Sequence, residues 1–251
     1  MELSGRHVVI TGGGTGVGAE LARCFAANGA SVTVTGRRRE PLEEVARETN
    51  ALAAVCDVTD RDSMNAALDH ARATHGPVTV AIANAGVAKS APFKAVKLEE
   101  LNEALAVNLT GTFNLWQATL ADMKESGWGR LIAIASTAGL KGYGYVSAYC
   151  AAKHAVVGLT RSIAIELGST PVTANAICPG YVETPMLERT IDNIVEKAGT
   201  TRDRARVRLT SASPQGRFIE TEEVAAAALW LCSEGARSVN GHALSISGGE
   251  V

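Results

Sequence analysis

The sequence predicts an α/β protein in which one doubly wound parallel sheet carries helices on both faces. Its 251 residues suit a single well-buried domain, so we expect residues 1–251 to form one domain. Short apolar runs bounded by glycine alternate with longer amphipathic stretches along the whole chain. Hydrophobicity within each short run is continuous, which is typical of strands covered on both faces. Repeated strand–helix units of this kind form a right-handed parallel sheet.

Seven apolar runs mark the expected strands. The first run is followed by a glycine turn and by a helix that continues to about Asn28. The expected strands are residues 7–11, 31–35, 52–55, 78–82, 131–135, 172–177 and 243–246.

One segment, near residues 181–217, interrupts this alternation with a polar stretch. It contains Arg202, Arg204, Arg206 and Arg208. Long insertions at the carboxyl edge of such sheets cover a ligand, so we expect a helical substrate loop here. A solvated helical excursion explains any single arginine equally well.

Composition and charge exclude several classes of protein. Hydrophobic residues make up 46% and charged residues 20%, as in a globular domain rather than a disordered chain. A formal net charge of −2 gives no field that favours nucleic acid or an anionic membrane. We find no signal peptide and no apolar run long enough to span a bilayer. Five scattered cysteines without metal-ligand spacing predict reduced thiols, no metal site and a cytoplasmic location.

A glycine-rich turn follows the first strand and opens the first helix: Thr11-Gly12-Gly13-Gly14-Thr15-Gly16-Val17-Gly18. Gly12 permits a tight turn, while Gly16 and Gly18 let the backbone approach a pyrophosphate and pack the helix on the strand. The helix N-terminus adds free amides and a partial positive charge. This context predicts a dinucleotide site, with a purely structural turn as the alternative.

Tyr149 and Lys153 are four residues apart on an expected helix, so both side chains reach one ligand. A free phenol has a pKa of about 10, and a nearby ammonium favours the phenolate. Tyr149 then donates a proton to a carbonyl oxygen or removes one from an alcohol. The alternative is a half-buried tyrosine beside a lysine that reaches out to solvent.

Two further polar residues support the catalytic interpretation. Ser136 ends the fifth strand, where its hydroxyl can orient a substrate oxygen. Asn108 lies in an apolar helical stretch, and a buried asparagine needs partners. A water bridging Asn108 to Lys153 would extend a proton relay towards solvent.

The glycine spacing after Thr11 resembles that of the short-chain dehydrogenase/reductase family. Other segments are similar to the family's motifs: Asn84-Ala85-Gly86 after the fourth strand, Asp57-Val58 after the third, and Pro179-Gly180 with Thr184 after the sixth. The family's usual asparagine before Asn84 is Ala83 here. The resemblance implies a Rossmann-type fold and hydride transfer between NAD(P)(H) and a secondary alcohol or ketone.

The resemblance also implies which residues carry this activity. The catalytic residues would be Asn108, Ser136, Tyr149 and Lys153, and Lys153 would also hydrogen-bond the nicotinamide ribose. The cofactor-binding residues would be Gly12, Thr15, Gly16, Val17, Gly18, Arg37, Asp57, Val58, Asn84, Gly86, Tyr149, Lys153, Pro179, Gly180, Val182 and Thr184.

The end of the second strand favours NADP(H) over NAD(H). NAD-preferring members carry an acid there, whereas this chain has Gly36 followed by Arg37, which can pair with a 2′-phosphate. Thr15 argues the other way, because many NADP(H)-preferring relatives carry arginine or lysine at that position.

Candidate substrate residues lie on two loops. Tyr143 and Tyr145 belong to a glycine-rich loop, and Tyr181, Met186 and Leu187 follow the sixth strand. An apolar wall with one polar focus suits a ketone or a secondary alcohol.

Residues 135–139 and 246–249 resemble the β-ketoacyl reductase and hydroxyacyl-thioester dehydrogenase branch. This branch implies a 3-oxoacyl or 3-hydroxyacyl thioester whose CoA or carrier-protein phosphates would meet the arginines of the insertion. A small free hydrophobic or aromatic alcohol or ketone is the alternative, and a non-catalytic nucleotide sensor is a third possibility. The family also implies a homotetramer.

Overall fold

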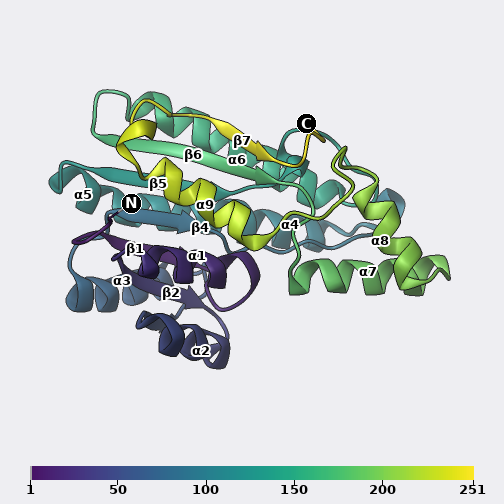
Figure 1. The fold of residues 1–251 in the computed structure, drawn as a ribbon, viewed down its shortest axis with the longest axis horizontal. Helices are drawn as coiled ribbons and strands as arrows, with labels where there is room; N and C mark the ends of the chain where they lie inside the picture. The colour runs from purple at the N-terminus through teal and green to yellow at the C-terminus, as the bar shows by residue number, and fades with distance from the viewer. Residues whose placement is uncertain (1) are drawn as a thin grey trace.

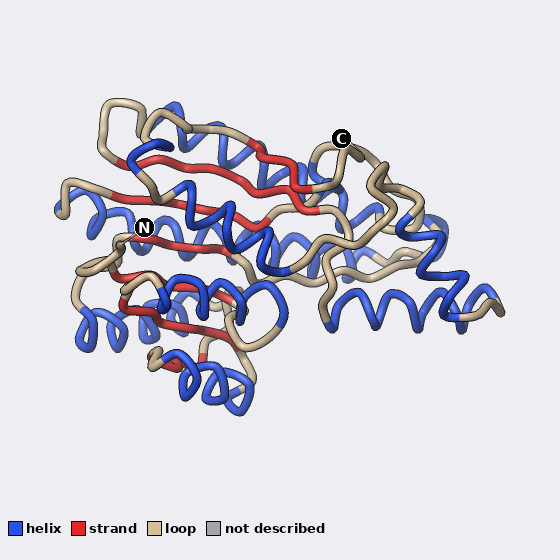
Figure 2. The backbone as a smooth tube through the Cα atoms, viewed as in Figure 1, coloured by secondary structure: helices blue, strands red, loops and turns tan. Residues whose placement is uncertain are grey.

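The computed structural model describes residues 2–251, and its centre is a seven-stranded parallel sheet (Figures 1 and 2). The strand order is β3-β2-β1-β4-β5-β6-β7, and every neighbouring pair runs parallel. The strands are β1 (His7–Thr11), β2 (Ser31–Gly36), β3 (Leu52–Val55), β4 (Val80–Ala83), β5 (Gly129–Ile134), β6 (Val172–Pro179) and β7 (Ala243–Ile246). All seven expected strands are confirmed.

Helices cover both faces of the sheet, as the continuous apolar runs predict. Successive strand residues point to opposite faces: Val8 and Ile10 pack on one side, and Val9 packs on the other. The first side is covered by α1 (Gly16–Ala27), α2 (Arg39–Thr49) and α9 (Thr221–Leu231). The second is covered by α3 (Arg61–His75), α5 (Gly111–Glu125) and α6 (Ser147–Glu166). No helix within residues 2–251 is long and apolar enough to cross a membrane.

The interrupting segment contains two helices, α7 (Pro185–Ala198) and α8 (Arg202–Thr210), which extend beyond the end of the sheet (Figure 1). Thr184 caps α7, because its hydroxyl accepts a hydrogen bond from the Leu187 amide at 3.4 Å. The two helices share a small apolar core with Phe218. The expected helical insertion is therefore confirmed.

The helix that was expected around Asn108 is not regular. Helix α4 (Leu98–Leu105) passes into a π-helical turn, Ala106–Thr110, before α5 begins. Asn108 Nδ2 donates to the Ala104 carbonyl at 2.8 Å, the oxygen that the Asn108 amide would use in an α-helix. The side chain thus competes with the backbone for this acceptor, which accounts for the local widening.

Candidate active site

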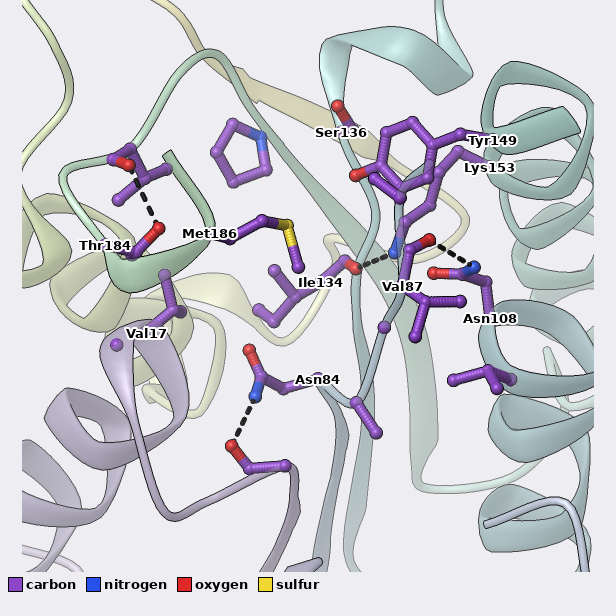
Figure 3. Close-up of a pocket in the computed structure, with 18 of the residues that line it drawn as sticks. Val17, Asn84, Val87, Asn108, Ile134, Ser136, Tyr149, Lys153, Thr184 and Met186 are labelled. Atoms are coloured by element: carbon purple, nitrogen blue, oxygen red, sulfur yellow. Dashed lines mark hydrogen bonds between the residues drawn. The ribbon is translucent and has the colours of Figure 1, made fainter. Parts of the chain in front are cut away.

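A cavity of about 580 Å³ opens at the carboxyl ends of the strands, with α7 along one side. It lies over β1 and β4, where the strand order reverses, and ligands of open α/β sheets bind at such a point. Most of the predicted site residues line this cavity, and Figure 3 shows several of them converging on it. The predicted residues that line it are Gly12, Thr15, Gly16, Val17, Arg37, Asp57, Val58, Asn84, Gly86, Asn108, Ser136, Tyr143, Tyr149, Lys153, Pro179, Gly180, Tyr181, Val182, Thr184, Met186 and Leu187.

Asn84 fastens the glycine-rich turn to the loop after β4. Its Nδ2 donates to the carbonyl oxygens of Thr11 at 2.9 Å and Gly12 at 3.1 Å, and one of these two bonds is drawn in Figure 3. The Thr11 hydroxyl accepts in return from the amides of Asn84 and Ala85, both at 3.1 Å. These bonds hold together the two strand ends that form the floor of the cavity.

The glycine-rich turn leaves the start of α1 open to an anion. Gly12 and Gly16 have φ values of 66° and 54°, a conformation that glycine adopts without strain. Thr15 makes no side-chain capping bond, so the first-turn amides remain available to a ligand. Gly18, predicted to bind the cofactor, does not line the cavity. A Cβ there would lie 2.2 Å from the Gly12 carbonyl oxygen, so Gly18 instead permits α1 to pack against the turn.

Two arginines line the cavity after β2: the predicted Arg37 and also Arg38, which the sequence analysis did not select. Asp57 lines the same cavity. Asp57 Oδ1 accepts from the Thr59 amide at 3.0 Å and the Thr59 hydroxyl at 2.8 Å. These bonds lower the pKa of Asp57, and the charge of Arg37 lowers it further.

Tyr149, Lys153 and Ser136 meet on one wall of the cavity (Figure 3). Lys153 Nζ donates to the Ile134 carbonyl at 2.8 Å and lies 5.6 Å from the centroid of the Tyr149 ring. Ser136 follows β5, and its Oγ accepts from the Ala138 amide at 3.1 Å. The i, i+4 spacing on α6 brings Tyr149 and Lys153 to the wall that Ser136 also lines, as predicted from the sequence.

Burial is the main influence on the pKa values of Tyr149 and Lys153. It raises the pKa of Tyr149 to about 12, although the Ser136 side chain acts in the opposite direction. It lowers the pKa of Lys153 to about 8, because the ammonium is removed from water. The expected lowering of the Tyr149 pKa by Lys153 is not found, since desolvation of the phenol outweighs its polar contacts.

Asn108 lies behind Lys153 with one polar atom unpaired. Its Nδ2 donates to the carbonyl oxygens of Ala104 and Val87, at 2.8 and 3.0 Å. Its Oδ1 is buried without a hydrogen-bond partner among the described residues. A Cβ built on Gly86 would lie 2.8 Å from this Oδ1 and 3.7 Å from Lys153 Nζ. The missing side chain of Gly86 thus leaves the space that adjoins both polar groups.

The substrate side of the cavity differs in one respect from the prediction. Tyr143, Tyr181 and Met186 line it, but Tyr145 does not. Tyr145 has a φ of 69°, and its carbonyl accepts from the Ala91 amide at 2.8 Å. Tyr145 instead lines a small neighbouring pocket that Tyr149 also borders, and 64% of Tyr145 is exposed. The assignment of Tyr145 to the substrate site stays a prediction.

Two of the four arginines of α8 form ion pairs within the protein. Arg202 pairs with Glu188 and Asp192 on α7, and Arg206 pairs with Glu183 and Glu188. These ion pairs fasten α8 to α7. Arg206 therefore already has carboxylate partners, which the sequence analysis did not anticipate. By contrast, Arg189 on α7 lines the cavity and was not selected from the sequence.

The fold and the cavity together define a class of protein. A doubly wound sheet with a glycine-rich turn at its switch point is the architecture of a dinucleotide-binding enzyme. A tyrosine, a lysine and a serine at the carboxyl edge add the means to move a proton to or from a substrate oxygen. The class is a nicotinamide-dependent oxidoreductase.

Comparison with known proteins narrows this class. Residues 6–195 match the family model described as short chain dehydrogenase. The chain is 32% identical to a D-beta-hydroxybutyrate dehydrogenase of Cupriavidus necator, with 99% of each chain covered. It is 34% identical to the granaticin polyketide synthase putative ketoacyl reductase 1 of Streptomyces violaceoruber, covering 96% of this chain and 91% of the relative.

Solved structures agree with these matches. A single-substitution variant of actinorhodin polyketide ketoreductase, solved with NADPH, superposes with a TM-score of 0.95 at 33% identity, covering 100% of this chain and 99% of the other. Levodione reductase superposes with a TM-score of 0.92 at 33% identity, covering 98% of each chain. The protein belongs to the short-chain dehydrogenase family. It is an oxidoreductase that uses a nicotinamide cofactor and acts on hydroxyl or ketone groups.

Proposed function

We propose that this protein is an NADPH-dependent reductase of apolar ketones in which Tyr149 donates the proton. The observation that carries the proposal is the position of Ser136, Tyr149 and Lys153 on one wall of a cavity whose other end is the glycine-rich turn. A dinucleotide bound at that turn would extend along the cavity towards this wall. When bound, the nicotinamide ring supplies the hydride.

The residues of the cavity fit such a cofactor. The turn offers backbone amides without Cβ atoms to block an approaching pyrophosphate, and Arg37 and Arg38 offer charge to a ribose phosphate. Pro179, Gly180, Val182 and Thr184 line the cavity along the segment that follows β6 and would hold the nicotinamide end.

The protonation states favour reduction at neutral pH. Burial raises the pKa of Tyr149 to about 12, so the phenol keeps the proton that a carbonyl oxygen must receive. Ser136 would hold that oxygen by a hydrogen bond. Lys153, whose pKa burial lowers to about 8, is ammonium at neutral pH and would bind the ribose. The unpaired Oδ1 of Asn108 is suited to a water that returns a proton through Lys153.

The substrate end of the cavity is largely apolar, which supports a ketone with hydrophobic or aromatic substituents. Val146, Tyr181, Met186 and Leu187 contribute to it. A second candidate is a 3-oxoacyl thioester, supported by relatives named ketoacyl reductase and 3-oxoacyl-[acyl-carrier-protein] reductase. The engagement of Arg206 with two carboxylates removes one expected contact for the phosphates of a thioester carrier.

The decisive experiment is a fluorescence titration with NADPH and NADH, followed by assays of NADPH oxidation with free ketones and with acetoacetyl-CoA. We expect NADPH to bind more tightly than NADH. Arg37→Ala should raise the Kd for NADPH about tenfold, the cost of a lost charge-assisted contact, and leave NADH unchanged. Arg39→Ala is the matched control, because Arg39 pairs with Glu43 and does not line the cavity.

The titration tests the cofactor site, and the assays distinguish the two candidate substrates. Equal dissociation constants for the two cofactors would refute the NADPH preference, and no binding of either would refute the nicotinamide site. A much higher kcat/KM for acetoacetyl-CoA than for every free ketone would favour the thioester candidate.

We also propose that residues 1–251 act as one catalytic domain, in the cytoplasm, as a homotetramer. All five cysteines are free, which supports a reducing compartment. Phe113, Ile165 and Trp230 are large apolar side chains that remain exposed on α5, α6 and α9, which supports association through these helices. Sedimentation velocity tests the assembly, and a monomer at micromolar concentration would refute it.

A further inference from the structure

The penultimate residue, Glu250, places a carboxylate beside the substrate end of the cavity. Its side chain is only 2% exposed. Glu250 Oε1 lies 2.6 Å from the Tyr143 hydroxyl and 3.0 Å from Lys141 Nζ. A buried carboxylate is costly unless it is paired, and these two contacts supply the pairing.

The Tyr143 hydroxyl is fully used in this arrangement. It also lies 2.7 Å from the Thr137 hydroxyl. A phenol has one proton, which goes to the stronger acceptor, the Glu250 carboxylate, so Thr137 donates to the phenol oxygen. Tyr143 lines the cavity, yet its polar atom has no remaining proton to donate to a substrate. The group that Tyr143 offers to the cavity is therefore its ring.

The loop around Tyr143 has little packing of its own. Glycines precede and follow the tyrosine, and a Cβ on Gly142 or Gly144 would meet no atom within 4 Å. Glycine gives the loop many accessible conformations, so local sequence does not fix the ring. The ring is held by the hydroxyl bonds to Glu250 and Thr137 and by Lys141, whose Nζ lies 5.1 Å from the ring centroid.

Glu250 also lies close to the segment that follows β6. A Cβ on Gly180, in the loop after β6, would lie 3.4 Å from Glu250 Oε2. The carboxylate thus stands between the Tyr143 loop and the loop that leads to α7.

We propose that Glu250 is a positioning residue of the substrate pocket, which fixes the Tyr143 ring as a flat apolar wall and so selects ketones with a ring substituent. The proposal rests on the proposed ketone reduction for its kinetic consequence. Its structural consequence, the anchoring of Tyr143, is independent of turnover.

The kinetic test compares a bicyclic ketone, 1-tetralone, with the small ketone 2-butanone. We expect Glu250→Ala to lower kcat/KM for 1-tetralone about tenfold, mainly through KM, because a hydrogen bond to a charged group is lost. The loss for 2-butanone should stay below about threefold, since a small ketone needs little of this wall. An equal loss of kcat/KM for both ketones would overturn the proposed selection of ketones with a ring substituent.

Further variants test whether Glu250 acts through Tyr143. Tyr143→Phe should reproduce the loss for 1-tetralone, and the double variant should lose no more than either single variant, because both remove one contact. Additive losses would overturn an action through Tyr143. Glu250→Gln keeps an acceptor for the phenol and should recover most of the activity. Glu125→Ala, at an exposed glutamate on α5, is the control for a change of charge.

A spectroscopic readout keeps this inference distinct from the proposed function. The chain has four tyrosines, so tyrosine labelled with ¹³C at the ring carbon bonded to oxygen gives a simple spectrum, and Tyr143→Phe assigns one signal. We expect Glu250→Ala to shift that signal, and Glu125→Ala to leave it unchanged. An unmoved signal would overturn the inference even in an active enzyme. If the wild type reduces no ketone while the signal shifts, the proposed function fails and the anchoring of Tyr143 stands.

Discussion

Substitution of Gly86 by alanine tests whether the space beside Asn108 and Lys153 is required. The new Cβ would lie 2.8 Å from Asn108 Oδ1, closer than a carbon and an oxygen normally approach. Asn108 cannot withdraw freely, because its Nδ2 holds the carbonyl oxygens of Ala104 and Val87. Relief of the clash therefore stretches or breaks these two hydrogen bonds.

The magnitude follows from those bonds. At about 1 kcal/mol each, their loss would lower the free energy of unfolding by about 2 kcal/mol. For a chain of this size, that corresponds to a fall in Tm of about 4–8 °C. The shift of Asn108 also disturbs the surroundings of Lys153, so we expect kcat/KM for ketone reduction to fall at least about tenfold.

Thermal unfolding and steady-state kinetics measure both effects on the same preparations. Gly235→Ala is the matched control, because Gly235 is an exposed position in the short 3₁₀ turn Glu234–Ala236, where a Cβ would meet only Ser233 Oγ, at 3.6 Å. Alanine there should leave both the Tm and kcat/KM close to the wild-type values. A Gly86→Ala protein with a Tm within about 1 °C of the wild type and kcat/KM within about twofold would refute this reasoning.

Two pH effects follow from buried bases. Burial lowers the pKa of Lys153 to about 8, so the ammonium is lost as pH rises through that value. We therefore expect kcat/KM for reduction to decline above pH 8. A flat profile up to pH 10 would contradict a catalytic role for the Lys153 ammonium. Burial lowers the pKa of His7 to about 4, while its unfolded value is 6.5, so the unfolded chain takes up the proton first as the solution is acidified. Stability should therefore fall by up to about 3 kcal/mol between pH 6.5 and 4. Urea unfolding at both pH values should show a smaller loss for His7→Gln, which takes up no proton, and an equal loss would refute the role of His7.

The strands and the catalytic pair were predictable because their patterns are local. A strand covered on both faces is apolar throughout, and Val8, Val9 and Ile10 show this directly. Likewise, Tyr149 and Lys153 share a helix face by spacing alone. Such features need no knowledge of distant contacts.

The features that the sequence did not reveal depend on tertiary partners or on rare backbone states. The carboxylates that hold Arg206 lie on another helix or a separate loop, and Glu250 meets Tyr143 across 107 residues. The left-handed φ of Tyr145 is uncommon for tyrosine, and nothing nearby in the sequence indicates it. The π-helical turn arises because Asn108 competes for a backbone carbonyl, a choice that burial of the side chain determines.

The packing of α9 beside α1 has a consequence for synthesis of the protein on the ribosome. Leu21 and Phe25 of α1 are fully buried in the apolar cluster that α9 helps to complete. Roughly 190 residues separate the two helices in the chain. At about 5–20 residues per second, the apolar face of α1 waits about 10–40 s for its cover. Throughout that interval the nascent chain exposes a surface to which chaperones bind, so its yield in a cell should depend on them more than its final stability suggests.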